Sequence, residues 1–350
     1  MGLATTTIIA ILVSLVAIPL SCLLKIHRND PYSYSKSFDK DTIARLSTDK
    51  VILITGANSG LGLSTAMHLA GAGTARKIIL TCRNLKKCYE AKRKLNEGVD
   101  IDVAQLDLSS LESIKLFPEK ISPLLPDNKL DILINNAGIM AVPHSIVGDT
   151  GVEIHMHVNH LGHFALTSLL FPHLEAAGGR VVSVSSITAS LPINLDDMNL
   201  EKSWYWNHFP TLQSIVAYGA SKRANLAFTS GFNRRFATRG VTAVAAHPGY
   251  SRTELMMNGW DFAPDWLRRF MTSNTVGSMG GDEGCLSQLR AALDIETVQC
   301  GDYVGPLWIG TGRPVVIGTV ERSACHWPIS DGLVESLWRF SEDAIGWKFE

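Results

Sequence analysis

VILITGANSGLG, residues 51–62, joins an apolar run to a glycine-rich turn. Residues 51–55 have the composition of a buried strand, and apolar periodicity predicts a helix over about 61–69. Glycines at 56, 60 and 62 let the backbone approach a pyrophosphate closely and place its charge at the start of that helix. The stretch therefore favours a dinucleotide-binding unit, although a tight turn without a ligand would use the same residues.

Further apolar runs follow, and helical patterns separate most of them. The predicted strands are 77–82, 101–106, 130–134, 180–185, 241–246 and 314–318. Such alternation builds a parallel sheet with helices on both faces. We therefore expect one α/β domain over residues 50–350, a doubly wound sheet of Rossmann type with about seven strands.

The first 24 residues contain no Lys, Arg, Asp or Glu and are long enough to cross a bilayer as a helix of about 33 Å. No basic residue precedes this run, which argues against a cleaved signal peptide. The next charges are mainly cationic, beginning with Lys25 and Arg28. We expect a membrane anchor at 1–24, a linker at 25–49 and a domain on the cytosolic side of the endoplasmic reticulum membrane. Because Pro19 can kink the helix, spanning and interfacial placement both stay open.

Charge and cysteine content exclude several classes of protein. Thirty-two Lys and Arg residues against 33 Asp and Glu leave a formal charge of −1. Without a basic field to hold a phosphate backbone, we expect no nucleic-acid partner. The six cysteines have neither metal-ligand nor disulfide-scaffold spacing, and no Asn-x-Ser/Thr site is present. These features predict a reducing environment and no metal site.

Polar residues and glycines follow the predicted strands, where an open α/β sheet places its ligand. They occur in the order Asp107, Asn135–Gly138, Asn159, Ser185–Ser186, Tyr218, Lys222 and His247–Gly249. Over residues 49–320 this order resembles the motif set of short-chain dehydrogenases/reductases, as does the spacing of the three glycines. TCRN, VNHLGHF, YGASKRAN, HPG and GDYVGP are most similar to the membrane-anchored retinol dehydrogenase group.

The resemblance implies a nicotinamide cofactor. The residues expected to bind it are Gly56, Ser59, Gly60, Leu61, Gly62, Arg83, Asp107, Asn136, Ala137, Gly138, Tyr218, Lys222, Pro248 and Gly249. Arg83 follows the second strand, where NAD-specific folds place an acidic residue. Its planar guanidinium suits a phosphate, and Lys86 and Lys87 lie nearby in the sequence. We therefore expect NADP(H).

Tyr218 and Lys222 are four residues apart, so they share one face of a helix. A free phenol titrates near 10, and a nearby ammonium together with an oxidised nicotinamide would bring Tyr218 toward neutral pH as the acid/base. Ser186 is expected to hydrogen-bond the substrate oxygen, with Ser185 as the alternative. By resemblance, Asn159 would hold a water in a proton relay through Lys222. Its simpler interpretation is a helix kink or cap.

The substrate is predicted from two aromatic-rich segments, 204–209 and 256–271, which are candidates for lids over a large apolar pocket. Ordinary core packing or a membrane-facing skirt would use the same residues. We expect a lipophilic alcohol and its aldehyde or ketone, with retinal-like, sterol and fatty-aldehyde substrates not separable. A non-catalytic NADP-binding regulator or scaffold is the alternative, and a homo-oligomer stays open.

Four histidines precede and follow Asn159. The residues His155, His157, His160 and His163 suggest a metal site at first sight, but no Cys or carboxylate ligand set accompanies them. We interpret them as structural. The C-terminal tail, with Trp338, Phe340 and Trp347, is expected to pack back on the domain.

Overall fold

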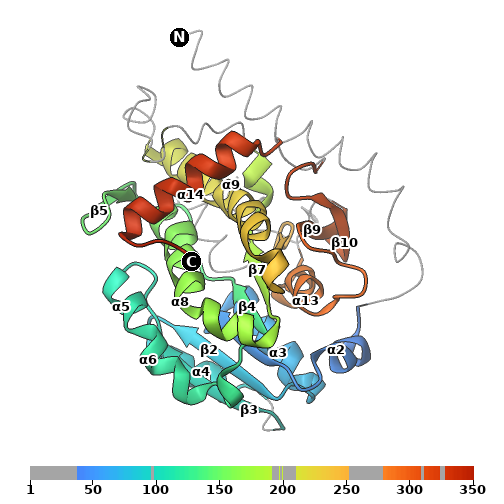
Figure 1. The fold of residues 1–350 in the computed structure, drawn as a ribbon. Helices are drawn as coiled ribbons and strands as arrows, with labels where there is room; N and C mark the ends of the chain where they lie inside the picture. The colour runs from blue at the N-terminus through green and yellow to red at the C-terminus, as the bar shows by residue number, and fades with distance from the viewer. Residues whose placement is uncertain are drawn as a thin grey trace.

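The computed structural model describes residues 38–95, 98–190, 197, 199, 210–251, 279–308, 311–323 and 328–350. An eight-stranded sheet in the order β10-β9-β8-β7-β4-β1-β2-β3 forms its centre (Figure 1). The strands are β1 (Val51–Thr55), β2 (Lys77–Cys82), β3 (Asp100–Gln105), β4 (Ile132–Asn135), β7 (Arg180–Val184), β8 (Thr242–Ala246), β9 (Asp302–Trp308) and β10 (Thr311–Thr319). A short hairpin of β5 (Ile146–Val147) and β6 (Val152–Glu153) lies outside this sheet.

The sheet is mostly parallel, as the alternation of elements predicted, but it differs from the prediction at one edge. β9 was not predicted, and β10, which includes the run 314–318, pairs with β9 in the antiparallel direction. Gly305 and Pro306 interrupt the apolar pattern of β9, and this strand pairs with β8 only through Tyr303 and Val304. The sheet therefore has eight strands rather than about seven.

Helices cover both faces of the sheet. They are α2 (Lys40–Ser47), α3 (Gly60–Ala72), α4 (Leu85–Lys92), α5 (Leu111–Lys115), α6 (Phe117–Ile121), α7 (Ile154–Met156), α8 (Gly162–Ala177), α9 (Pro210–Phe236), α12 (Gly281–Gly284), α13 (Leu286–Leu293) and α14 (Asp331–Ile345). Alternate residues of β1 belong to two separate hydrophobic clusters. Val51 and Leu53 pack in the cluster that includes α8 and α9, whereas Ile52 and Ile54 pack in the cluster that includes α3 and α13. This two-sided burial explains the continuous apolar runs of the central strands.

The predicted linker ends earlier than expected, because residues 40–47 form α2. The Asp39 side chain caps this helix by accepting a hydrogen bond from the Thr42 backbone N–H at 2.9 Å. Ile43 is buried in the hydrophobic cluster shared with α3 and α13. Residues 1–24 and most of the linker lie outside the described residues, and no described helix is long and apolar enough to cross a membrane.

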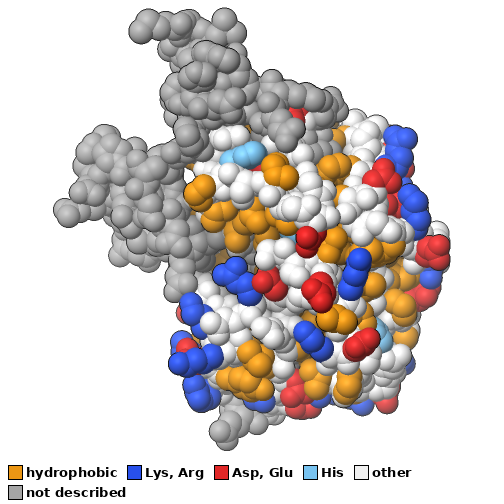
Figure 2. All heavy atoms as spheres, turned by 90° about the vertical axis from the view of Figure 1, so that its left-hand side faces the viewer, with side chains coloured by type: hydrophobic (Ala, Val, Ile, Leu, Met, Phe, Trp, Pro, Cys, Tyr) orange, Lys and Arg blue, Asp and Glu red, His pale blue; other side chains and the backbone are white. Residues whose placement is uncertain are grey.

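The C-terminal tail packs back on the domain, as predicted. α14 lies along α9 (Figure 1), and Trp338 packs edge-on against Phe164 of α8, with ring centroids 4.9 Å apart. The Trp347 indole N–H donates to the Ser168 hydroxyl at 3.0 Å. Elsewhere, Figure 2 shows acidic and basic side chains interspersed with apolar ones over the described part of one face.

Candidate active site

The candidate site is assembled at the carboxyl ends of adjacent parallel strands. β1, β4 and β7 are neighbours in the sheet, so the turns that follow them meet at one edge. These turns carry the glycine motif, Asn136–Gly138 and Ser185–Ser186. The order of the strands thus brings together residues that are far apart in the sequence.

The glycine turn packs tightly against the turn after β4. Gly56 has a φ of +66°, and a Cβ there would lie 2.9 Å from Ala137 Cα. At Gly62, a Cβ would lie 2.5 Å from the Gly56 carbonyl oxygen. Ser59 precedes the 13-residue helix α3 without a side-chain cap, and Gly60 and Leu61 form its first turn. This uncapped helix start suits the pyrophosphate of a dinucleotide.

Thr55, at the end of β1, holds the turn after β4. Its hydroxyl oxygen accepts the backbone N–H groups of Asn136 and Ala137, each at 2.9 Å. The Asn136 side-chain amide donates to the Thr55 carbonyl at 2.7 Å. Gln288 of α13 donates to the Asn136 side-chain oxygen at 3.3 Å. The segment that would face a cofactor is therefore fixed by groups from β1 and α13.

Tyr218 and Lys222 are buried close together, and the half-buried Ser186 lies beside Tyr218. Tyr218 is 6% exposed and Lys222 is 3% exposed, with the Lys222 ammonium 5.7 Å from the centre of the Tyr218 ring. The Ser186 hydroxyl lies close enough to the Tyr218 hydroxyl to favour the phenolate and lower the pKa of Tyr218. Ser186 Oγ also accepts the Thr188 backbone N–H at 3.2 Å. A carbonyl or alcohol oxygen placed here would meet two hydroxyl groups.

The two serines have different positions. Ser185 is buried, and its hydroxyl donates to the Lys222 carbonyl oxygen at 2.8 Å, which ties α9 to the end of β7. Ser186 is the serine that contacts Tyr218. Of the two candidates, Ser186 is therefore the one beside the Tyr218 hydroxyl, and Ser185 supports the helix.

Burial dominates the electrostatics of this cluster. It raises the pKa of Tyr218 to about 12, against the opposite effect of the Ser186 hydrogen bond, and it lowers the pKa of Lys222 to about 8. The Lys222 ammonium donates to the Val184 carbonyl at 3.0 Å. Burial therefore sets the direction of the Tyr218 shift, and Lys222 is not among its causes. The lowering of this pKa by an ammonium together with an oxidised nicotinamide stays a prediction for the site with its cofactor bound.

Asn159 links the turn after β4 to helix α9. It lies in a π-helical turn, His157–Leu161, where its side chain accepts the Ile139 N–H at 2.7 Å and donates to the Ser221 hydroxyl at 2.9 Å. A Cβ on Gly138 would lie 3.1 Å from Asn159 Oδ1 and 3.4 Å from the Lys222 ammonium. Glycine at position 138 therefore lets the backbone approach both side chains.

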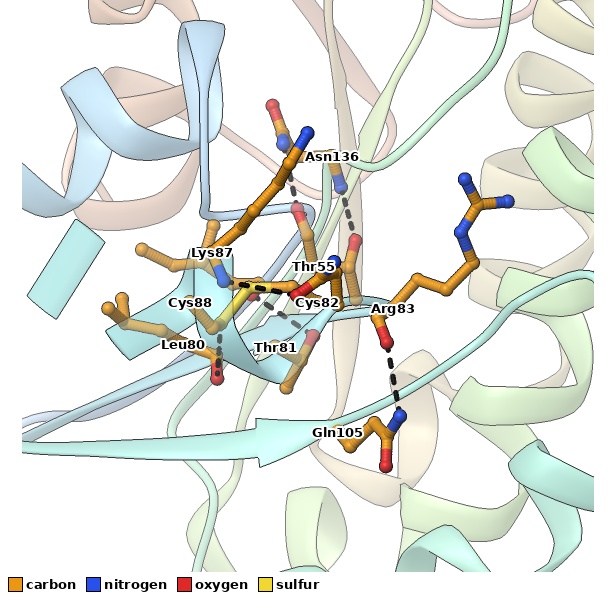
Figure 3. Close-up of a disulfide and its surroundings, with 11 residues drawn as sticks. Thr55, Leu80, Thr81, Cys82, Arg83, Lys87, Cys88, Gln105 and Asn136 are labelled. Atoms are coloured by element: carbon orange, nitrogen blue, oxygen red, sulfur yellow. Dashed lines mark hydrogen bonds between the residues drawn. A yellow bond between two sulfur atoms is a disulfide. The ribbon is translucent and has the colours of Figure 1, made fainter. Parts of the chain in front are cut away.

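The opposite end of the candidate cofactor site follows β2. Arg83 is exposed, and its side chain extends away from the strand end (Figure 3). Asn84 caps α4 by accepting the Lys87 backbone N–H at 3.2 Å. This turn presents the cationic side chains of Arg83, Lys86 and Lys87 to solvent.

A disulfide joins Cys82 to Cys88 at this turn, although the spacing of the cysteines indicated none. The chain leaves β2, turns at Asn84 and returns in the first turn of α4, which brings the two Cα atoms to 5.9 Å. Spacing along the sequence does not reveal this return. Figure 3 shows the disulfide to the left of Arg83.

The remaining predicted cofactor residues lie at the ends of β3 and β8. Asp107 follows β3 and accepts the backbone N–H and hydroxyl of Ser109 at 2.9 and 2.6 Å. Gly249, with a φ of +66°, donates its N–H to His247 Nδ1 at 3.2 Å. The Pro248 carbonyl accepts the Ser251 hydroxyl at 2.7 Å. Both aromatic-rich segments, 204–209 and 256–271, lie outside the described residues.

Several residues that support the cluster were not predicted from the sequence. Thr55 and Ser221 were not singled out, and His163 was interpreted only as a structural histidine. Each is buried and hydrogen-bonded to a predicted site residue or to the turn that carries one. Thr55 could have been found as a hydroxyl residue at the end of the strand that precedes the first glycine. His163 could have been found as a histidine four residues after Asn159.

Comparisons with known proteins agree with this geometry. A family model described as short chain dehydrogenase matches residues 50–196. Mouse retinol dehydrogenase 12 is 41% identical over 301 residues, which cover 83% of this chain and 87% of the mouse protein. Human retinol dehydrogenase 13 is 41% identical over 211 residues, which cover 59% of this chain and only 60% of the human protein.

A solved structure described as a short chain dehydrogenase/reductase family protein superimposes with a TM-score of 0.53, at 21% identity, covering 74% of this chain and 96% of that one. At this identity the likeness supports the fold alone. Family membership rests on the retinol dehydrogenase matched over most of both lengths. The chain belongs to the short-chain dehydrogenase/reductase family and, within it, to the retinol dehydrogenase group.

Proposed function

We propose that this protein is an NADP(H)-dependent oxidoreductase that interconverts a lipophilic alcohol and its aldehyde or ketone. The observation that carries the proposal is the buried cluster in which the Tyr218 hydroxyl contacts Ser186 and the Lys222 ammonium lies nearby. A non-catalytic NADP-binding protein of this fold would have no need for all three side chains at one place.

Proton transfer is assigned to Tyr218. In the reducing direction its phenol gives a proton to the substrate oxygen, and in the oxidising direction it takes the proton back. Because burial favours the neutral phenol, the free chain holds Tyr218 ready as an acid. The Ser186 hydroxyl would hydrogen-bond the same oxygen and stabilise its developing negative charge. The nicotinamide, when bound, supplies or accepts the hydride.

Cofactor binding is assigned to both ends of the site. The uncapped start of α3 would take the pyrophosphate, and the turn from Asn136 to Gly138 would line the nicotinamide side. The preference for NADP(H) rests on Arg83, Lys86 and Lys87, which offer positive charge where a 2′-phosphate would lie. Asp107, Pro248 and Gly249 are the further residues that would hold the cofactor.

The substrate is assigned as lipophilic because the matched relatives are retinol dehydrogenases and because the chain begins with a charge-free apolar run. Retinal-like, sterol and fatty aldehydes share the required chemistry, an apolar body with one reducible carbonyl. Such a substrate would partition into a membrane, where an enzyme anchored through residues 1–24 could reach it.

The decisive experiment replaces Tyr218 by Phe in the full-length protein. We expect turnover of a panel of lipophilic aldehydes and ketones with NADPH to fall about 1,000-fold or more, because only the transferable proton is lost. Tyr89→Phe, which removes an exposed hydroxyl on α4, is the matched control and should keep its activity. Cofactor binding by the Tyr218→Phe variant should persist. Activity within about tenfold of wild type would contradict the assigned role.

Membrane anchorage is tested separately with the full-length chain in microsomes. Alkaline carbonate should leave a spanning protein in the membrane, whereas an interfacial segment would be released. Protease added to sealed microsomes should digest the domain and leave a small membrane-retained fragment. Protection of the domain would contradict a cytosolic orientation.

A further inference from the structure

His163 lies between the two parts of the candidate site. It is in the first turn of α8, four residues after Asn159, and is 3% exposed. Its Nδ1 is 3.0 Å from the Asn159 carbonyl oxygen, and its Nε2 is 2.9 Å from the Thr55 hydroxyl. One imidazole ring therefore spans from the π-helical turn to the residue that holds the turn after β4.

The hydrogen-bond partners define which ring nitrogen carries the proton. A carbonyl oxygen can only accept, so Nδ1 must donate to Asn159. The Thr55 hydroxyl oxygen already accepts two backbone N–H groups, from Asn136 and Ala137, so its own proton is free to be donated. The Thr55 oxygen lies closer to His163 Nε2, at 2.9 Å, than to its other acceptor, the Ile134 carbonyl, at 3.3 Å. Thr55 therefore donates to Nε2.

His163 has to be neutral for this arrangement. Burial lowers its pKa to about 4, and the nearby Lys222 ammonium acts in the same direction. At neutral pH the ring thus has one donor and one acceptor, and both are used. Thr167 provides a second link between His163 and β4. Its hydroxyl donates to the His163 carbonyl and accepts from the Asn135 side chain at 3.0 Å.

We propose that His163 is a positioning residue for the proposed oxidoreduction. Its Nδ1–H donates to the Asn159 carbonyl, and its Nε2 accepts from the Thr55 hydroxyl. His163 thus connects Asn159 with the turn after β4, residues 136–138, which is called the cofactor turn below. The inference rests on the proposed function. Asn159 in turn contacts Ile139 and Ser221, and the Ser221 hydroxyl donates to the Tyr218 carbonyl at 2.7 Å. His163 thereby keeps the cofactor turn and the helix bearing Tyr218 in a fixed relation.

His160 offers a matched control in the π-helical turn, three residues before His163. It is 1% exposed, and burial lowers its pKa to about 3. Its Nε2 lies 2.8 Å from the Ser341 hydroxyl of α14, on the side away from the cofactor turn. Replacement of either histidine disturbs an equally buried position, but only His163 contacts Thr55 and the Asn159 carbonyl.

The test compares Phe and Asn at both positions in the full-length protein. Asn at 163 has a side-chain N–H where Nδ1 was, whereas Phe has no donor. We expect His163→Phe to lower kcat about 30- to 100-fold with the carbonyl KM within about threefold, since small displacements of a positioned group have effects of this size. His163→Asn should restore kcat to within about fivefold of wild type, and His160→Phe should stay within about threefold.

Three kinetic outcomes would overturn the proposal. They are an equal loss of kcat in His160→Phe, no recovery in His163→Asn at matched thermal stability, and a loss confined to KM. If His163→Phe does not fold, Thr55→Val removes the hydroxyl that donates to Nε2 and should lower kcat in the same way.

A spectroscopic measurement separates this proposal from the proposed function. The nitrogen chemical shifts of His163 in labelled wild-type protein, assigned by their absence in His163→Asn, report which ring nitrogen carries the proton. We expect the Nδ1–H tautomer at neutral pH. A protonated Nε2 would overturn the assignment whether or not the enzyme turns over, whereas absent turnover with the expected tautomer would contradict only the proposed oxidoreduction.

Discussion

The two ends of the candidate cofactor site are built in opposite ways. At one end, Tyr218 and Lys222 are almost fully buried, and hydrogen bonds from three separate elements hold the groups around them. At the other end, Arg83 and its neighbouring lysines are exposed, and the loop that carries them is held by the Asn84 cap and a disulfide. Burial changes the free energies of protonation of Tyr218 and Lys222, whereas Arg83 and the lysines beside it supply positive charge at the surface.

Each end has an environment that suits the chemistry proposed for it. Proton transfer to a substrate depends on the pKa of the transferring group, and burial in the folded chain changes that pKa. Recognition of a phosphate needs a cation that meets the ligand directly, and exposure costs it little. Substitutions at the two ends should therefore differ in size and in their dependence on pH.

The largest expected effect is on stability at the buried end. The pKa of Lys222 is lowered from 10.5 to about 8, so between these values the unfolded chain binds a proton that the folded chain does not. Stability from this group therefore rises with pH from about 8, and below pH 8 the full cost of burying the ammonium is present. That cost is on the order of 3 kcal/mol.

Urea unfolding of wild type and Lys222→Met from pH 7 to pH 10 measures this effect. The variant should gain most over wild type at pH 7, and the gain should shrink toward pH 10. The series stops at pH 10 because the raised pKa of Tyr218 acts with the opposite sign above that value. Lys86→Met, at an exposed position, should change stability by no more than about 0.5 kcal/mol throughout. A gain independent of pH would show that Lys222 is not desolvated.

Much of the fold could be predicted because the central strands are buried on both faces. Continuous apolar runs predicted β1, β2, β4, β7 and β8 close to their observed bounds. The edge of the sheet was less predictable, because Gly305 and Pro306 interrupt the apolar pattern of β9. Helix α2 was not predicted, because it lies in a polar stretch in which Ile43 is the buried apolar residue. Local pattern does not reveal burial that a distant element provides.

The same limit applies to the candidate site. Residues in short motifs, such as Tyr218 with Lys222, could be predicted because helix geometry alone places them on one face. The Thr55–His163 contact joins positions 108 residues apart, so no pattern of neighbouring residues in the sequence predicts it. The raised pKa of Tyr218 was also unpredictable, because the extent of desolvation depends on the complete packing.

The next effect concerns the covalent tie at the exposed end. A disulfide that closes so short a loop lowers the conformational entropy of the unfolded chain. This stabilises the folded state by about 2 kcal/mol. Reductant should therefore lower the free energy of unfolding by about this amount in wild type and leave a Cys82→Ala/Cys88→Ala variant unaffected. Peptide mapping without reduction should recover the Cys82–Cys88 crosslink. Wild-type stability that does not respond to reductant, together with separate peptides, would contradict the bond.

The smallest expected effect is the most selective one. Arg83→Asp replaces a phosphate partner by a carboxylate that repels a 2′-phosphate and can accept the ribose hydroxyls. The ratio of kcat/KM for NADPH over NADH should fall at least about tenfold, which corresponds to about 1.4 kcal/mol. Arg93→Asp, at the far end of α4, makes the same change of charge at another exposed position and should leave the ratio within about twofold. A ratio unchanged in Arg83→Asp would assign the phosphate to Lys86 or Lys87, whereas equal shifts in both variants would show that the net field, rather than a direct contact, selects the cofactor.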